Sequence, residues 1–336
     1  MNWTNVIVLR SGELLPGSCG LRVRPVRLQV RSRLIWRALW RDFFSLWNPG
    51  IKQRCGEAAQ TGRVQNEGTE LSYGIFVINL PDALERSERV RRHLADLGLD
   101  SAVIIDAVRG SLLSASERGL LADDARSVAR YGRTLTAGEL GCALSHVRAY
   151  ERLLAGSDDF ALILEDDAVL LPDVVRLLSS ESVQDWLMQP EPRVLLMTPV
   201  RAFLERGALP LPRGYRLVRV RRAWEGYGYL VNRAAAEVMR CINSPAWLSA
   251  DDWVAYRKLG RVELRGVDPF CIGFLETAPS QLEDDRRRVE MAPGRSRSLE
   301  ARLEKWGRQF MDLAYYRPIW GLGRHRMPSG WPVSRK

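Results

Sequence analysis

The sequence predicts an α/β fold with a mainly parallel central sheet covered by helices. Between residues 73 and 110, an apolar β-branched run, a helical pattern and a second apolar run follow one another, which is the order of a βαβ unit. A longer helical pattern and another strand-like apolar run then extend to residue 165. In open sheets of this kind, ligands bind beyond the carboxyl ends of the strands.

Composition and length are those of a globular, intracellular protein. The chain has 336 residues, 46% of them hydrophobic, so it can bury a substantial core. Arginines interrupt every apolar run before the roughly 18 to 20 residues that a membrane span needs. The N-terminus lacks the order of a cleavable signal, and five cysteines without a C-x-x-C pair fit a reducing compartment. We therefore expect a cytoplasmic location.

The basic residues are concentrated at the two ends of the chain. The net charge of +10 divides into +6 for residues 1–72, −5 for residues 73–285 and +9 for residues 286–336. The middle segment is therefore the expected catalytic or binding domain, and its charge argues against a nucleic-acid partner. Residues 1–72 follow no single period and predict a basic extension that is disordered or arises from a start codon assigned too far upstream. A basic amphipathic helix over residues 32–47 that lies on an anionic membrane is the alternative.

The first βαβ unit begins with YGIFVINL, a short strand that starts at Tyr73. PDALERSERVRRHLADLGL then predicts a helix with apolar residues along one face, closed by Gly98. SAVIIDAVRG predicts the second strand. Asn79 and Asp106 fall at the carboxyl ends of these two strands, where a ligand is expected.

The next helix is predicted from TLTAGELGCALSHVRAYERLLAG. Thr136 and Glu139 have the spacing of a capping box, and the apolar residues that follow lie on one helical face. His146 is adjacent to Ser145, and neighbouring helix residues do not face each other, so they cannot form a nucleophile and base pair. With three histidines in the chain, hydrolysis through histidine or zinc chemistry is disfavoured, and His146 is expected to be a hydrogen-bonded helix residue.

The strand ALIL ends in three consecutive acids, Glu165, Asp166 and Asp167. Like charges at the end of a buried strand repel one another and raise each other's pKa. A divalent cation removes this conflict, and carboxylate oxygens favour Mg²⁺ or Mn²⁺. A solvated turn is the alternative reading of the same three acids.

Several motifs together resemble glycosyltransferase family 25, of the lipopolysaccharide and lipooligosaccharide galactosyltransferase type. VINLPDALERSERVRRHLADLGL, IDAVRG, LTAGELGCALSH and ALILEDDA occur in the family's order and at similar separations. The likeness continues more weakly through GYGYLVNRAAAEVM, SADDWVAY and PSQLEDD. It therefore covers about residues 73–285 and includes neither end of the chain.

The resemblance implies a Rossmann-like α/β sandwich of the GT-A type, a nucleotide-sugar donor and Mn²⁺ or Mg²⁺ as cofactor. The three acids match the family's D-x-D element, with glutamate in the first position. Asp167 is then the metal ligand, and Glu165 assists it directly or through water. Asp166 is expected to touch the ribose or the donor sugar.

The resemblance also implies donor-binding residues around the first βαβ unit. Asn79 and Leu80 would meet the nucleoside, Arg86 would approach uracil or phosphate, and Asp106 would bond a ribose hydroxyl. A solvated helix face is the alternative for Arg86 and Arg89. Since the family members considered invert the anomeric centre, a general base is also required.

The candidates for that base come from SADDWVAY. Asp252 is the first choice and Asp251 the substitute, although Asp251 could instead cap the following helix. Tyr227 and Tyr229 are expected to form an aromatic wall for the acceptor sugar. The insertion of Glu225 and Tyr227 departs from the family pattern and leaves the acceptor open.

The expected function is metal-dependent, inverting transfer of a hexose, with galactose favoured, from a UDP-sugar. The acceptor would be a glycolipid or an oligosaccharide of lipopolysaccharide or a related glycoconjugate. The alternative is a catalytically silent nucleotide- or carbohydrate-binding module on the same fold. A nucleotidyltransferase is disfavoured because the sequence has no G-x-x-x-x-G-K-[ST] loop.

The C-terminal segment, residues 286–336, is basic and rich in aromatic residues. An apolar stripe at helical spacing joins Leu299, Leu303, Trp306, Phe310 and Leu313. Such a helix suits the surface of an anionic bilayer, which would place the protein on the inner face of the cytoplasmic membrane. The alternative is that the stripe packs back on the catalytic domain.

Overall fold

The computed structural model describes residues 72–274, 306–307 and 309–325. The N-terminal extension predicted for residues 1–72 lies outside this part of the chain, apart from Ser72, and so does residue range 275–285. All described residues belong to one compact unit, Gly62–Lys336. Among them, no helix is both long and apolar enough to cross a membrane.

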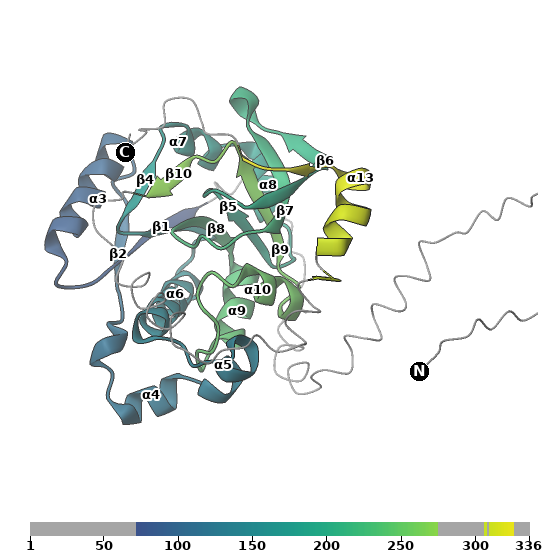
Figure 1. Cartoon of the computed structure of the whole chain (residues 1–336). Coiled ribbons are helices and arrows are strands. Elements are labelled where there is room, and N and C mark those ends of the chain that lie inside the picture. Colours follow the sequence, from purple (N-terminus) through teal and green to yellow (C-terminus); the bar gives the residue numbers. More distant parts are fainter. Residues whose placement is uncertain (1–71, 275–305, 308, 326–336) are drawn as a thin grey trace, which may run out of the picture. The chain divides into compact units, whose positions relative to one another are not determined.

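A nine-stranded sheet forms the centre of the described structure, with strand order β11-β6-β7-β9-β5-β8-β3-β1-β2 (Figure 1). Its strands are β1 (Tyr73–Asn79), β2 (Val103–Asp106), β3 (Phe160–Glu165), β5 (Arg193–Leu196), β6 (Ala202–Pro210), β7 (Arg216–Arg222), β8 (Gly228–Asn232), β9 (Glu263–Asp268) and β11 (Leu322–Gly323). Strands β4 (Ala168–Leu170) and β10 (Ile272–Phe274) form a separate antiparallel pair.

The direction of the strands is mixed. The pairs β1–β2, β1–β3 and β5–β9 are parallel, whereas β8 runs antiparallel to both β3 and β5. Strands β6 and β7 form an antiparallel hairpin, and β7 is antiparallel to β9. Most strands of the sheet therefore run in the same direction, as predicted; these are β1, β2, β3, β5, β6 and β9. The strands that run in the opposite direction are β7, β8 and β11.

Helices cover both faces of the sheet (Figure 1). They are α3 (Leu84–Asp96), α4 (Ala115–Leu121), α5 (Asp124–Tyr131), α6 (Ala137–Ala155), α7 (Asp173–Leu178), α8 (Glu181–Leu187), α9 (Arg233–Ile242), α10 (Trp253–Leu259) and α13 (Arg317–Trp320), with short turns η1 (Gly110–Leu112), η2 (Pro212–Gly214) and the π-helical η3 (Asp312–Tyr316). Helices α3, α7 and α8 pack in one hydrophobic core, and α6, α9 and α10 pack in the other.

The strands divide their side chains between these two cores. In β1, Phe76 and Ile78 join the core under α6, whereas Ile75 and Val77 join the core under α3. This alternation follows from the period of two along a strand that is buried on both faces. The predicted α/β sandwich, with helices on both faces of the sheet, is therefore confirmed.

The predicted boundaries of the first helices are confirmed as well. Helix α3 is followed by Gly98 with φ +72°, a left-handed conformation that favours glycine. At the start of α6, the Thr136 hydroxyl accepts from the backbone N–H of Glu139, and the Glu139 carboxylate accepts from the backbone N–H of Thr136. This capping box fixes where α6 begins.

Two glycines bring the segment after β2 into close contact with α6. A Cβ atom on Gly110 would lie 1.8 Å from the backbone oxygen of Ala137, and one on Gly141 would lie 2.4 Å from that of Val108. Neither position can therefore carry a side chain without a backbone shift. The contact holds α6 against the carboxyl ends of the parallel strands.

The C-terminal segment packs on the far side of the sheet from β2. Strand β11 pairs antiparallel with β6. The Asp312 carboxylate accepts hydrogen bonds from Arg221, at 3.1 Å, and from Arg222. The guanidinium of Arg221 also stacks on Tyr316, 4.3 Å from the ring centroid. These contacts attach one face of the segment to strand β7.

Candidate active site at the carboxyl edge of the sheet

The carboxyl ends of β1, β2 and β3 meet at one edge of the sheet. In the parallel register, Asn79 pairs with Asp106 and Ile78 pairs with Glu165. The residues that the sequence analysis selected at three separate strand ends are therefore neighbours. We refer to Glu165, Asp166 and Asp167 as the acid cluster.

Asp167 has the most perturbed carboxylate of the acid cluster. Its Oδ1 atom is buried and has no hydrogen-bond partner. Burial, together with the charges of Glu165 and Asp166, raises the pKa of Asp167 to about 7. A buried acceptor without a partner is rare in native proteins, and a bound ligand is one of its explanations.

Asp166 is paired with a cation of helix α3. Its Oδ1 accepts a hydrogen bond from Arg86 at 3.0 Å, and its side chain is almost fully buried. Burial raises the pKa of Asp166, while Arg86 and Arg89 oppose this rise. The contact places Arg86 beside the acid cluster, while its expected role toward uracil or phosphate stays a prediction.

Two further buried polar atoms near this edge have no partner in the described structure. They are Oδ1 of Asn79 and Nη2 of Arg89. The amide of Asn79 donates instead to the backbone oxygen of Leu80 at 2.7 Å. An unpaired acceptor, an unpaired guanidinium nitrogen and an unpaired carboxylate oxygen suit a ligand that carries phosphates and hydroxyl groups.

The other two residues predicted to bind the donor also lie at this edge. Leu80 is half-buried, and Asp106 is exposed at the end of β2.

The donor atoms of the acid cluster fit a hard divalent cation. The oxygens come from carboxylates, which are the ligands of Mg²⁺ and Mn²⁺. The pKa of Asp167 is raised first by burial and second by repulsion from Glu165 and Asp166, and a bound cation would favour the charged carboxylate against both effects. A solvated turn, the alternative reading, would leave all three acids exposed, whereas Asp166 is buried and Glu165 and Asp167 are half-buried.

The two tyrosines proposed as an aromatic wall occupy different environments. Tyr229 is 0% exposed, and its hydroxyl bonds to Tyr150 and His146, so it belongs to the core rather than to a sugar-facing surface. The ring of Tyr227 packs edge-on against Phe274 at 5.4 Å, and Phe274 is 45% exposed. The exposed aromatic beside the acid cluster is therefore Phe274, which the sequence analysis missed.

Asp252 is a structural residue in this fold. It is 1% exposed, and its carboxylate accepts from Arg130 at 2.7 and 2.9 Å and from the Tyr131 hydroxyl at 2.8 Å. It also caps α10 by accepting from the backbone N–H of Ala255. The cap that the sequence analysis considered for Asp251 is thus made by its neighbour, and these bonds occupy the lone pairs a general base would need.

Asp251 packs against the loop that precedes Tyr227. It is half-buried, and a Cβ on Gly226 would lie 3.4 Å from its Cβ atom. Gly226 precedes Tyr227, whose backbone oxygen accepts from the N–H of Glu165 at 3.1 Å. The backbone oxygen of Glu225 accepts from the Trp253 indole at 2.9 Å, so this loop is fixed beside α10.

Two residues of α6 also reach the acid cluster, and sequence reasoning did not assign them to it. His146 Nε2 lies 3.4 Å from Glu165 Oε1, and the sulfur of Cys142 lies 4.0 Å from the same oxygen. Cys142 and His146 are four residues apart, which places them on one helical face. That spacing, together with the strand end at Glu165, is the feature of the sequence that could have predicted the approach of these two residues to the acid cluster.

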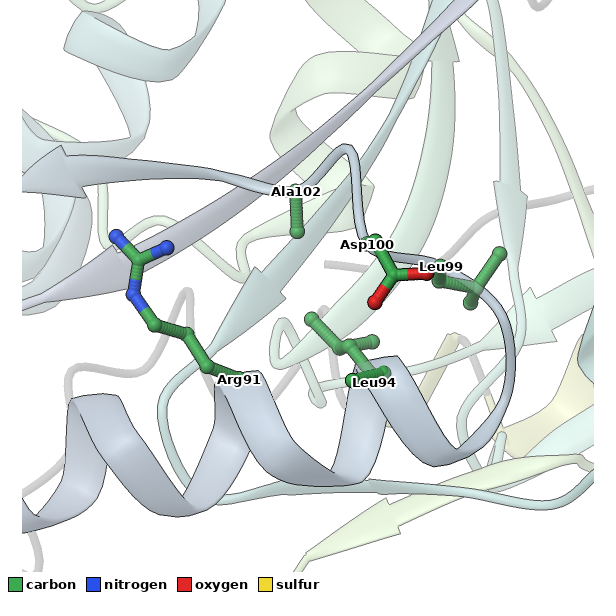
Figure 2. A pocket seen from close by; sticks show the side chains of 6 residues that line it. Arg91, Leu94, Leu99, Asp100 and Ala102 are labelled. Carbon is green, nitrogen blue, oxygen red and sulfur yellow. The ribbon is translucent and has the colours of Figure 1, made fainter.

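A surface pocket among the described residues lies elsewhere (Figure 2). It has a volume of about 160 Å³ and lies between the C-terminal end of α3 and the start of β2, at the amino edge of the sheet. Its lining consists of Arg91, Leu94, Ala95, Leu99, Asp100 and Ala102. This pocket contains none of the unpaired polar atoms described above, so the candidate site is the carboxyl edge.

Comparison with known proteins finds similarity over part of the chain. Residues 73–192 match the model of glycosyltransferase family 25, described as an LPS biosynthesis protein family. Procollagen galactosyltransferase 1 of Danio rerio is 29% identical over 190 residues, which are 55% of this chain and 31% of that protein. The inactive glycosyltransferase 25 family member 3 of Homo sapiens is 38% identical over 100 residues, which are 28% of this chain and 16% of that protein.

Among solved structures, a glycosyltransferase involved in the glycosylation of the major capsid of PBCV-1 resembles the chain only coarsely. It has 13% identity and a TM-score of 0.30, and it covers 66% of this chain and 100% of its own. This chain also spans less than a third of the length of the two curated relatives named above.

The fold and the site define an α/β protein with an acid cluster at the carboxyl ends of its parallel strands. The strand ends that carry the acid cluster lie within residues 73–192, the part of the chain that is similar to glycosyltransferase family 25.

Proposed function

We propose that this protein is a metal-dependent glycosyltransferase that moves a hexose from a UDP-sugar to a saccharide acceptor, with inversion at the anomeric carbon. The donor sugar proposed is galactose, because the Danio rerio relative is named a galactosyltransferase. The acceptor proposed belongs to lipopolysaccharide or a related glycoconjugate, in line with the description of the family.

The observation that carries this proposal is the unpaired, buried Oδ1 of Asp167 in the acid cluster. Asp167, with Glu165 beside it, would hold Mn²⁺ or Mg²⁺. The cation supplies positive charge where the leaving diphosphate gains negative charge.

The chain's own residues would bind and orient the donor around this point. Arg86 and Arg89 on α3 offer guanidinium donors to phosphate, and Arg86 has donors left after its bond to Asp166. The Asn79 Oδ1 atom can accept from the nucleoside, because it is buried and unpaired. Asp106 at the end of β2 lies in register with Asn79 and would accept from a ribose hydroxyl.

Asp251 is the proposed general base. Its neighbour Asp252 uses its oxygens for Arg130, Tyr131 and the cap of α10, whereas Asp251 lies against the loop that leads to Tyr227. A carboxylate in that position would take the proton of the acceptor hydroxyl as the new bond to the anomeric carbon forms. Tyr227 and Phe274 would contact the acceptor sugar.

A membrane surface is the proposed location of the acceptor. Trp306, Phe310 and Leu313, which are 76%, 68% and 66% exposed, form an apolar ridge at helical spacing. We call these three residues the C-terminal ridge. Exposed apolar residues in the same segment as the exposed Arg317 and Arg324 suit the interface of an anionic bilayer. Leu299 and Leu303, the other members of the predicted stripe, lie outside the described residues.

The experiment that tests the proposal is metal-dependent cleavage of UDP-galactose and other nucleotide sugars by the purified protein. Cleavage with Mn²⁺ and its loss in Asp167→Asn are expected. Asp185→Asn, on the exposed side of α8, is the matched control and should behave like the wild type. Normal manganese-dependent cleavage in Asp167→Asn would remove the metal assignment.

A silent binding module remains the second candidate, since the human relative is named inactive. This reading predicts that calorimetry detects binding of a uridine sugar although no nucleotide sugar is cleaved with any divalent cation. Cleavage of one donor would exclude it.

A further inference from the structure

We infer that Cys142, His146 and Glu165 form a second metal site, selective for Zn²⁺, next to the acid cluster. Their ligand atoms, a thiol sulfur, an imidazole nitrogen and a carboxylate oxygen, all lie within 4.8 Å of one another. Thiolate and imidazole ligands favour zinc over the hard cations that carboxylates alone select.

Two of the three distances between ligand atoms can be compared with those of an occupied zinc site, and the third lies within 4.8 Å. With ordinary zinc–ligand bonds and tetrahedral angles, the nitrogen and oxygen would be about 3.4 Å apart and the sulfur and oxygen about 3.6 Å apart. The corresponding separations here are 3.4 Å from His146 to Glu165 and 4.0 Å from Cys142 to Glu165. The site is therefore nearly preformed, and small side-chain movements would complete it.

The imidazole is oriented for coordination through Nε2. Its Nδ1 atom lies 2.7 Å from the Tyr229 hydroxyl, which in turn lies 2.8 Å from the Tyr150 hydroxyl. Metal-bound histidines have such a partner on the other ring nitrogen. Without zinc, the Nε2–H can donate to Glu165, and the Tyr229 hydroxyl donates to Nδ1. With zinc on Nε2, the proton is on Nδ1 and Tyr229 accepts it, so the pair of phenols satisfies both states.

Access to this site is from the side of Glu165. His146 is 2% exposed, whereas the Glu165 side chain is 28% exposed. Three protein ligands leave the fourth tetrahedral position to water. Binding of Zn²⁺ displaces the thiol proton of Cys142 to the solvent, so the ion coordinates a thiolate.

Glu165 is shared between this zinc site and the acid cluster. Zinc would hold Oε1 of Glu165 toward α6 and so compete with the cation at Asp167. This competition rests on the proposed function, whereas the zinc site itself does not. The consequence is inhibition of donor cleavage by zinc.

Cobalt absorption tests the site without any activity measurement. The full chain, reduced and freed of metal, is titrated with Co²⁺ while the thiolate-to-cobalt charge-transfer band is followed. We expect the wild type to show this band and Zn²⁺ to abolish it. Cys142→Ser should lose the band. Cys241→Ser should keep it, because Cys241 lies on α9 and forms a hydrogen bond with Glu237.

Tyr229→Phe tests whether His146 coordinates the metal ion, because the variant removes the hydrogen-bond partner of His146 Nδ1. Loss of the partner on Nδ1 should weaken cobalt and zinc binding roughly 10- to 100-fold, while the band itself persists at saturation. Circular dichroism checks that each variant is folded. Absence of the band in the wild type, or its persistence in Cys142→Ser, would overturn the zinc site.

A second measurement tests the competition. With Mn²⁺ and donor present, zinc should inhibit donor cleavage by the wild type. Cys142→Ser should need at least about tenfold more zinc for the same inhibition. Equal inhibition of both proteins would overturn the competition. A cobalt band in a protein that cleaves no donor would contradict the proposed function and leave the zinc site in place.

Discussion

Asp167, the proposed metal ligand, lowers the free energy of unfolding of the metal-free protein at neutral and higher pH. Its pKa is raised from 3.8 to about 7, so the folded protein holds an extra proton between about pH 4 and pH 7. The free energy of unfolding therefore falls as the pH rises through this window and stays lower above it. In the metal-free protein above pH 7, the carboxylate is charged, buried and beside two other acids.

We therefore predict that Asp167→Asn stabilises the metal-free protein at pH 8, by on the order of 1–3 kcal/mol, and that the gain disappears near pH 4. The same variant should lose manganese-dependent donor cleavage about a hundredfold or more. Thermal unfolding with chelator at both pH values, and a nucleoside diphosphate release assay, measure the two effects. Equal melting temperatures of the wild type and Asp167→Asn at pH 8 would contradict the destabilising effect assigned to the charged Asp167 carboxylate.

The two acids of SADDW should behave differently. Asp252→Asn removes the ion pair between the buried Asp252 and the partly exposed Arg130 and should cost about 1–3 kcal/mol of folding free energy. Asp251→Asn should leave the melting temperature unchanged and reduce turnover roughly 10²- to 10⁴-fold, with little change in donor binding. Calorimetric melting and steady-state kinetics distinguish them. An Asp252→Asn protein that melts normally but has no turnover would return the base role to Asp252, and full activity in both would direct attention to Glu225.

At the scale of elements, His325 links the C-terminal segment to β9. Its Nδ1 lies 3.0 Å from Asp268, its ring packs against Phe203 and Phe270, and its Nε2 is buried without a partner in the described structure. Burial lowers the pKa of His325 from its ordinary 6.5, although Asp268 opposes this and Arg216 reinforces it. The folded protein thus binds fewer protons here than the unfolded chain just below pH 6.5.

The contribution of His325 to stability is therefore complete above pH 6.5 and is lost as the pH falls below that value. We predict that the wild type loses up to about 1 kcal/mol more than His325→Gln between pH 7.5 and pH 5.5. Glutamine can still donate to Asp268 but cannot gain a proton. Urea unfolding at the two pH values measures the difference, and parallel losses in both proteins would show that His325 does not titrate in this range.

At the scale of the whole molecule, the C-terminal segment has two faces with different roles. Asp312 and Tyr316 attach one face to β7, and the C-terminal ridge is exposed on the other. Removal of residues 296–336 would delete both, and would also remove β11 from the sheet. Substitution of the ridge alone tests membrane docking more sharply.

We predict that the triple change of Trp306, Phe310 and Leu313 to serine weakens binding to anionic vesicles at least tenfold, on the order of the interfacial energy of these side chains. Donor cleavage in solution should persist, while transfer to a membrane-embedded acceptor slows. Gln309→Ser, an exposed position beside the ridge, is the control. Vesicle sedimentation at low and high salt measures binding, and unchanged binding of the triple variant would exclude the ridge as the docking surface.

The sequence by itself determined the local elements and the position of the acid cluster. Apolar periodicity predicted β1, α3 and α6, and the capping box at Thr136 and the glycine after α3 predicted their ends, because these signals act within a few residues. The acid cluster could be placed at the sheet edge since a parallel βαβ unit brings strand ends together.

Only the tertiary structure decided what surrounds each candidate side chain. The antiparallel insertion of β8 beside β3 buries Tyr229, and the packing of α5 against α10 commits Asp252 to Arg130. The contact of Phe274 with Tyr227 and the approach of α6 to Glu165 likewise join residues far apart in the chain. Such contacts depend on long-range strand pairing and helix packing, which local periodicity does not encode.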